Sequence, residues 1–240
     1  MGIVAGVLAL MMVVAAGAIL LNDDQPAVSA APSTPPPAAT STSASADACD
    51  TTVPAGAGDT KPTYDEPKDQ GLDPTQRYIA TMVTSCGPIQ IELLPEVAPQ
   101  GVNNFVFLAT EGYYDGLTFN RVVKDFVIQG GAATGTSGPG YQFATETSPK
   151  QTFDAAGLVA YANAGPDTNG SAFFITLAPL PNLDPGPNGS YTIFGKVIKG
   201  MDVVNKIGAV PTQAGPGCPA GEICSPVQPV YISSVTISRI

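Results

Sequence analysis

The sequence predicts a mainly β domain, a barrel or a sandwich, that follows a long N-terminal segment of different composition. Three observations support this prediction. After Arg77 the chain of 240 residues contains many short apolar runs with the alternation typical of strands. Turn-forming residues separate these runs. Only two stretches show the spacing of an amphipathic helix, and many short strands with few helices are typical of all-β barrels and sandwiches.

The N-terminus predicts a membrane or export segment. Residues 3–21, IVAGVLALMMVVAAGAILL, form an uninterrupted apolar run. A helix of this length spans roughly 28 Å, which matches the hydrocarbon core of a bilayer. We therefore expect residues 1–21 to form a transmembrane signal anchor of a single-pass cell-membrane protein. The alternative is a signal peptide cleaved after Val28-Ser29-Ala30, in which case the protein is secreted.

The next segment has the composition of a linker. From residue 22 to residue 73 the chain is rich in Ala, Pro, Ser and Thr, as in APSTPPPAATSTSASADA. It has few large apolar side chains, so burial cannot offset the entropy lost when such a segment is ordered. We expect residues 22–73 to be a disordered linker and residues 74–240 to be the folded domain.

Four cysteines, Cys49, Cys86, Cys218 and Cys224, follow the apolar segment. An even number of cysteines in an exported chain predicts disulfides, and four cysteines allow three pairings. The stretch CPAGEIC suggests a local loop between Cys218 and Cys224, which leaves Cys49 to connect the end of the linker to Cys86. Four free thiols are the alternative. A zinc site is disfavoured because no CxxC spacing appears.

Local patterns predict the elements of the domain in order. Residues 77–84 and 88–93 alternate apolar and polar side chains around Cys86-Gly87-Pro88, which predicts a β-hairpin. Residues 99–112 have helical spacing, with a proline in the first turn and a glycine at the end. A second, short helix is expected at 200–208. Further strands are expected at 118–123, 126–131, 157–163, 171–177, 191–198 and 230–240.

Composition excludes several classes of function. The net charge is -10 and the chain has no basic stripe, which argues against nucleic acid as a partner. The chain contains no histidine, which excludes nucleophilic triads with histidine, histidine-ligated metals and histidine acid–base catalysis. We expect neither a metal nor another cofactor. Any catalysis must rely on arginine, carboxylates, tyrosine, amides or backbone groups.

Arg121 lies in TFNRVVKDFVIQGG, residues 118–131, which otherwise predicts buried strands. Its guanidinium stays charged at any accessible pH. Either its aliphatic stem carries the charge to the surface, or the fold requires a fixed cation beside an apolar pocket.

Four segments resemble, in order and spacing, the cyclophilin-type peptidyl-prolyl cis-trans isomerases: GYYDGLTFNRVVKDFVIQGG, GTSGPGYQF, GLVAYANAGPDTNGSAFFIT and YTIFGKVIKGMDVVNKI. The resemblance covers residues 77–240. It implies a closed eight-stranded antiparallel barrel capped by two helices, which agrees with the pattern of elements above. It also implies isomerase (rotamase) activity on Xaa-Pro bonds without a cofactor, with proline-containing polypeptide segments as partners.

The resemblance assigns roles to individual residues. Arg121 matches the catalytic arginine of the family, a fixed donor aimed at the prolyl nitrogen. The substrate-binding positions combine an apolar slot for the proline ring with a polar edge for the substrate backbone, and they are Phe126, Val127, Gln129, Ala162, Asn163, Phe174, Leu183 and Tyr191.

The rim of the expected pocket departs from the family pattern at Asn120, Ala172, Asn182 and Tyr191. Two hypotheses therefore stay open. The first is a monomeric isomerase outside the cytoplasm that assists the folding of exported proteins and is held at the membrane by its N-terminal segment. The second is a proline-binding scaffold or chaperone module with little isomerase turnover.

Overall fold

The computed structural model describes residues 48–133, 138–148, 151–185, 191–215 and 218–240. Eight strands of this part form one antiparallel sheet in the order β10-β1-β2-β7-β5-β6-β4-β3. Their bounds are Tyr78–Thr84 (β1), Gly87–Leu93 (β2), Phe119–Val123 (β3), Val127–Gly130 (β4), Leu158–Tyr161 (β5), Phe173–Thr176 (β6), Ile193–Lys199 (β7) and Ile232–Arg239 (β10).

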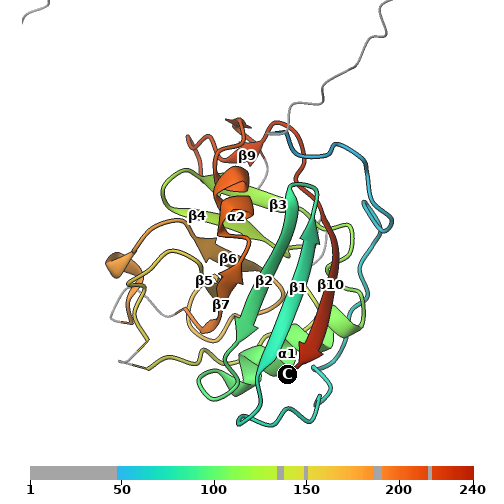
Figure 1. The fold of residues 1–240 in the computed structure, drawn as a ribbon, viewed down its shortest axis with the longest axis vertical. Coiled ribbons are helices and arrows are strands. Elements are labelled where there is room, and N and C mark those ends of the chain that lie inside the picture. Colours follow the sequence, from blue (N-terminus) through green and yellow to red (C-terminus); the bar gives the residue numbers. More distant parts are fainter. Residues whose placement is uncertain (1–47, 134–137, 149–150, 186–190, 216–217) are drawn as a thin grey trace, which may run out of the picture. The chain divides into compact units, whose positions relative to one another are not determined.

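The sheet is curled into a half-barrel, as Figure 1 shows, and not into the closed barrel that the resemblance implies. Its two edges approach each other where β3 and β10 begin, because Thr118 forms an isolated bridge with Tyr231. Beside this bridge the N–H of Phe119 donates to the carbonyl of Val230 at 2.9 Å. The C-terminal segment therefore lies against the strand that carries Arg121.

Two α-helices, α1 (Pro99–Thr110) and α2 (Met201–Gly208), lie at opposite ends of the curled sheet (Figure 1). Pro99 suits the first turn of α1 because its φ is already fixed near the helical value. α2 follows Gly200, whose φ is 88°. A Cβ at Gly200 would lie 2.5 Å from the carbonyl oxygen of Pro88, so this close approach requires glycine.

The alternation of side chains along the strands divides the buried residues into two clusters. Ile128, Val159, Phe173 and Phe194 belong to the main core inside the curled sheet. Their sequence neighbours point the other way and form a smaller cluster with Phe153 and Leu180, consisting of Val127, Ala160, Phe174 and Ile193. The smaller cluster underlies the candidate site described below.

The main sheet and both α-helices occur where the sequence predicts them. The β1–β2 hairpin, for example, pairs Tyr78 with Leu93 and Thr84 with Gly87. Sequence patterns did not predict a short hairpin formed by β8 (Thr212–Gln213) and β9 (Ser225–Pro226), or a 3-10 helix, η1 (Pro181–Leu183).

Residues 48–73 differ from the disordered linker that the sequence predicts, because they pack against the domain. The side chain of Lys61 is buried, and its ammonium group donates to the carbonyls of Asp115 and Gly56. The ring of Tyr64 packs edge-on against Phe107 with centroids 4.9 Å apart. The segment is held by a few widely spaced buried residues of this kind. It therefore lacks the continuous apolar pattern that would indicate a folded segment.

The rest of the predicted linker, residues 22–47, and the predicted transmembrane segment, residues 1–21, lie outside the described residues. Among the helices in the described residues, none has both the length and the hydropathy of a membrane-spanning segment.

The predicted disulfides are present, and of the three possible pairings the structure has Cys49 bonded to Cys86 and Cys218 bonded to Cys224. The first bond ties the start of the described segment to the β1–β2 turn. The second joins two positions in the loop between β8 and β9.

Candidate active site

The structure brings all the predicted site residues together around one pocket of about 100 Å³. They come from β3, the β3–β4 turn, β4, β6, η1 and the segments that follow β5 and precede β7. The lining residues are Arg121, Phe126, Val127, Gln129, Ala162, Asn163, Phe174, Leu183 and Tyr191. Arg121 is the one cationic residue among them, so the pocket combines a fixed charge with an apolar slot.

The turn between β3 and β4 places a cation beside an aromatic ring. Asp125 adopts a left-handed conformation with φ 58°, which lets the chain reverse within a few residues. The N–H of Phe126 donates to the carbonyl of Val123 at 3.1 Å and closes the turn. The guanidinium carbon of Arg121 then lies 5.9 Å from the centre of the Phe126 ring, within the range of a cation–π contact.

The rings of Phe174 and Tyr191 belong to the apolar wall, and a third aromatic ring supports them. Phe174 is 5% exposed, and its ring stacks on that of Phe153 with centroids 5.8 Å apart. Tyr191 stands edge-on to Phe174 at 5.5 Å and to Phe153 at 6.4 Å. Edge-to-face and offset arrangements of this kind stabilise aromatic clusters beyond the area that they bury.

Phe153 is a supporting residue that sequence reasoning missed. It is fully buried but does not line the pocket. Its N–H donates to Oδ1 of Asp184 at 2.6 Å, and its carbonyl accepts from Leu180 at 2.7 Å. These bonds tie Phe153 to the segment around η1, which carries Leu183 of the pocket. The only signal in the sequence was one aromatic residue in a loop of polar and small residues.

The polar edge of the pocket is formed by the residues directly after β5 in the sequence. The N–H of Ala162 donates to the carbonyl of Ala172 at 2.9 Å. The amide nitrogen of Asn163 donates to Oδ1 of Asn169 at 3.1 Å, which fixes this side chain toward the protein. The main chain at 162–163 is therefore held in place beside the proline slot.

A buried network supports this edge from behind. The hydroxyl of Tyr161 donates to the carbonyl of Gly101 at 2.8 Å and accepts from the amide of Asn104 at 2.9 Å. Burial raises the pKa of Tyr161 well above its usual value, so the phenol stays protonated and keeps its donor. The end of β5 is thereby connected to α1.

Arg121 has an ionic partner that sequence reasoning did not find. One guanidinium nitrogen lies 3.3 Å from Oε2 of Glu222, a residue in the loop that Cys218 and Cys224 enclose. The Arg121 side chain is 17% exposed and that of Glu222 is 46% exposed. The pair therefore lies at the rim of the pocket rather than at its base.

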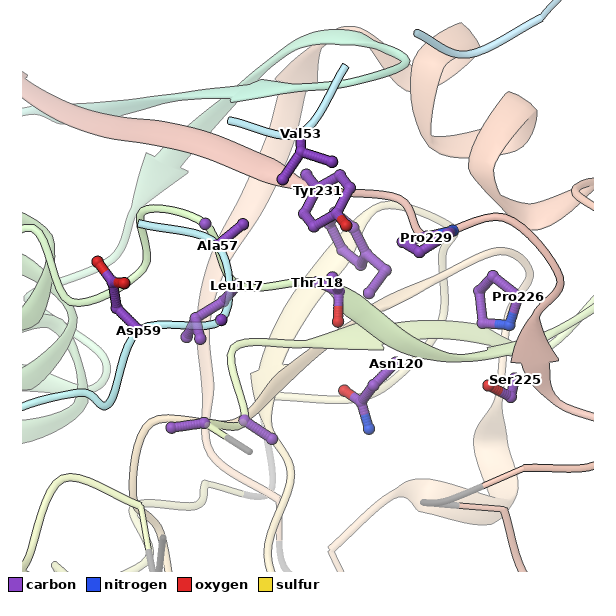
Figure 2. A pocket seen from close by; sticks show the side chains of 15 residues that line it. Val53, Ala57, Asp59, Leu117, Thr118, Asn120, Ser225, Pro226, Pro229 and Tyr231 are labelled. Carbon is purple, nitrogen blue, oxygen red and sulfur yellow. The ribbon is translucent and has the colours of Figure 1, made fainter. Parts of the chain in front are cut away.

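A larger cavity of about 640 Å³ lies beside β3 and shares no lining residue with the Arg121 pocket. Figure 2 shows Ala57 and Asp59 of the N-terminal segment on one side and Pro226 and Pro229 on the other, with Val53 next to Tyr231 between them. None of its lining residues is basic. Its size therefore does not make it the better candidate for chemistry that requires a cation.

Comparisons with known proteins agree with the geometry. The family described as cyclophilin-type peptidyl-prolyl cis-trans isomerase matches residues 79–237. Peptidyl-prolyl cis-trans isomerase B of Streptomyces anulatus is 41% identical over 181 residues, which cover 68% of this chain and 97% of that protein. Peptidyl-prolyl cis-trans isomerase-like 1 of Rhizopus delemar is 49% identical over 145 residues, which cover 58% of this chain and 86% of that protein.

A solved structure shows the same fold. The cyclophilin-type peptidyl-prolyl cis-trans isomerase of Cryptosporidium parvum, crystallised in the presence of the dipeptide Ala-Pro, superimposes with a TM-score of 0.57. Its sequence is 33% identical, and the match covers 67% of this chain and 98% of that chain.

Proposed function

This chain belongs to the cyclophilin-type peptidyl-prolyl cis-trans isomerase family, and on that premise we propose that the Arg121 pocket is where it rotates Xaa-Pro bonds. Unaided rotation has a barrier of about 18–20 kcal/mol and takes tens to hundreds of seconds. The reaction needs no nucleophile, metal or proton relay, so a chain without histidine can perform it. It requires that amide resonance is weakened while the proline ring is held.

The apolar wall performs the holding step. Val127 and Phe174 are 2% and 5% exposed, and Leu183 of η1 lines the same pocket. A proline ring that enters this slot leaves water, and burial of its apolar surface supplies binding free energy. Because the rings of Phe153 and Tyr191 support Phe174, the slot exists before the substrate arrives.

Arg121 performs the electrostatic step. In the twisted amide the prolyl nitrogen becomes pyramidal and its lone pair accepts a hydrogen bond, which it cannot do in the planar amide. A guanidinium fixed beside the ring slot stabilises this state more than the ground state, and such differential stabilisation accelerates rotation. The observation that carries this proposal is the position of Arg121, the one cation among the residues around the slot.

The test is cis–trans exchange of a short Xaa-Pro peptide, measured by NMR with the full chain and its Arg121→Ala variant. We expect the wild type to cause exchange between the cis and trans signals of the peptide and to broaden them. The variant should lose roughly 100-fold or more in kcat/KM, as enzymes do when one oxyanion-hole donor is removed. Peptide binding without exchange would instead support a proline-binding scaffold. Exchange that is indifferent to Arg121 would contradict the mechanism.

The setting that we propose is outside the cytoplasm, with exported proteins as clients. All four cysteines of the chain are paired in two disulfides, and disulfides persist in oxidising compartments. The apolar run at 3–21 would hold the domain at the membrane. Protease added to intact cells should then digest the domain, and full protection in intact cells would contradict this location.

A further inference from the structure

The hairpin formed by β8 and β9 lies along β3, the strand that carries Arg121. The N–H of Val122, the residue after Arg121, donates to the carbonyl of Cys224 at 2.7 Å. Cys224 is fully buried, and Ser225 and Pro226 of β9 lie beside Asn120 in Figure 2. The hairpin is thus attached to β3 immediately next to the proposed catalytic residue.

The disulfide loop at the tip of this hairpin, residues 218–224, carries Glu222 back to Arg121. The N–H of Glu222 donates to the carbonyl of Pro219 at 2.9 Å, so the loop turns just before the carboxylate. The disulfide between Cys218 and Cys224 closes the loop on both sides of Glu222. The main chain that presents the carboxylate is therefore fixed by a buried hydrogen bond at one end and by a covalent bond across it.

We propose that Glu222 is a positioning residue for Arg121 and that the Cys218–Cys224 disulfide holds it in place. This inference rests on the proposed role of Arg121. Among the described residues, Glu222 is the ion-pair partner of Arg121, at 3.3 Å. The hairpin and the pocket come from distant parts of the chain, since these two residues are 101 positions apart.

A guanidinium on a long side chain needs such a partner to be preorganised. Arginine has several rotatable bonds, and a fixed donor stabilises a transition state only if it need not reorganise at the moment of reaction. The carboxylate contacts one terminal nitrogen, and the guanidinium has five N–H donors in all. Donors remain for the prolyl nitrogen while the carboxylate and the Phe126 ring restrict the rotamer.

The first test compares kcat/KM for an Xaa-Pro peptide between the full chain and its Glu222→Ala and Glu222→Gln variants. A partly exposed ion pair predicts a loss of roughly threefold to fivefold for Glu222→Ala. Glu222→Gln keeps an acceptor for the guanidinium and should retain most of the activity. The matched control is Glu111→Ala, which removes an exposed ion pair with Lys68 and should leave kcat/KM unchanged.

A double-mutant cycle shows whether Glu222 acts through Arg121. If it does, Glu222→Ala has no further effect in an Arg121→Ala background. An equal loss in both backgrounds, or no loss in either, overturns the positioning role. If Arg121→Ala abolishes exchange while Glu222→Ala does not alter it, only this inference fails. If Arg121→Ala is itself without effect, the proposed mechanism fails.

A second route removes the disulfide and keeps Glu222. The variant Cys218→Ser with Cys224→Ser should show the same loss in kcat/KM as Glu222→Ala. Combining all three substitutions should lower kcat/KM no further than either variant does alone. The control is Cys49→Ser with Cys86→Ser, because that disulfide joins the N-terminal segment to the β1–β2 turn and does not enclose Glu222. Full activity in the first variant, with its fold verified by circular dichroism, overturns the role of the disulfide.

Discussion

Arg121 and Gln129 lie directly opposite each other across the ladder of β3 and β4. Directly opposed residues of an antiparallel pair point to the same face of the sheet, so one register places a cation and an amide on one pocket wall. A shift of either strand by one residue would turn its side chain to the other face and separate the pair. The bulge between Phe119 and Arg121 is part of this alignment.

The shape of the guanidinium, and not only its charge, should matter at position 121. We expect Arg121→Lys to keep the positive charge but to lose the planar fork that bridges Glu222 and the pocket. The predicted loss in kcat/KM is at least about tenfold, with an unchanged free energy of unfolding within about 0.5 kcal/mol. NMR exchange and urea unfolding measure the two quantities. Wild-type activity in this variant would show that a point charge suffices.

Phe153 should contribute more to stability than the pocket residues that it supports. It is fully buried and stacks on Phe174, so Phe153→Ala should lower the free energy of unfolding by about 3–5 kcal/mol. Phe126→Ala is the control, because Phe126 is only half-buried and lines the pocket directly. We expect this control to raise KM with a smaller loss of stability. Equal losses of stability in urea unfolding would contradict the supporting role of Phe153.

The sequence predicted the eight strands of the main sheet from local signals, whereas it predicted the pocket residues from the resemblance to the cyclophilin-type family. Alternation locates the strands, and the motif around Arg121 has a fixed spacing within the β3–β4 unit. Gln129 was assigned by the same resemblance, and the structure pairs it with Arg121 across β3 and β4. Residues that lie on regular elements were thus accessible to prediction.

Residues for which neither a periodic pattern nor the resemblance supplied a signal were not predicted. Glu222 reaches Arg121 only because the β8–β9 hairpin lies along β3, and no periodicity in residues 212–226 predicts that contact. Phe153 precedes β5 in a loop, where a single aromatic residue does not reveal its partner. The packing of residues 48–73 depends on isolated anchors such as Lys61 and Tyr64, and an overall composition typical of disorder conceals them.

Gly116 should be required for the docking of the N-terminal segment. Its φ is 78°, and an added Cβ would lie 2.2 Å from the carbonyl carbon of Gly56. We expect Gly116→Ala to cost at least about 1–2 kcal/mol in the free energy of unfolding and to expose residues 53–59 to limited proteolysis.

Gly112→Ala is a matched control for this prediction. Gly112 also has a positive φ, 66°, but its added Cβ would meet only the carboxylate of Asp115, at 3.4 Å. Both variants therefore place an alanine at a positive φ, and only Gly116→Ala also produces a clash with Gly56. Increased cleavage at residues 53–59 in Gly116→Ala alone is the expected result. The same cleavage pattern in both variants would mean that the segment does not depend on this contact.

Glu92 should make the stability of the domain depend on pH. Its carboxylate lies 2.9 Å from Nζ of Lys196 and 2.8 Å from Nε of Arg77. Hydrogen bonds from Lys196, and then from Arg77, hold the pKa of Glu92 below its usual value of 4.5. Because the folded state binds this proton more weakly than the unfolded state, the stabilisation is complete above that usual value and is lost as the pH falls through the lower pKa of the folded state.

Glu92→Gln should therefore remove part of the acid sensitivity. At pH 7 we expect the variant to be less stable than the wild type by about 0.2–1 kcal/mol, because both cationic partners are largely exposed. Urea unfolding between pH 7 and pH 3 should show the two stabilities converging as Glu92 becomes protonated. Glu96→Gln, at an exposed glutamate, controls for the loss of one carboxylate and should follow the wild type. Parallel curves for Glu92→Gln and the wild type across this range would show that the two cations do not stabilise the folded state through Glu92.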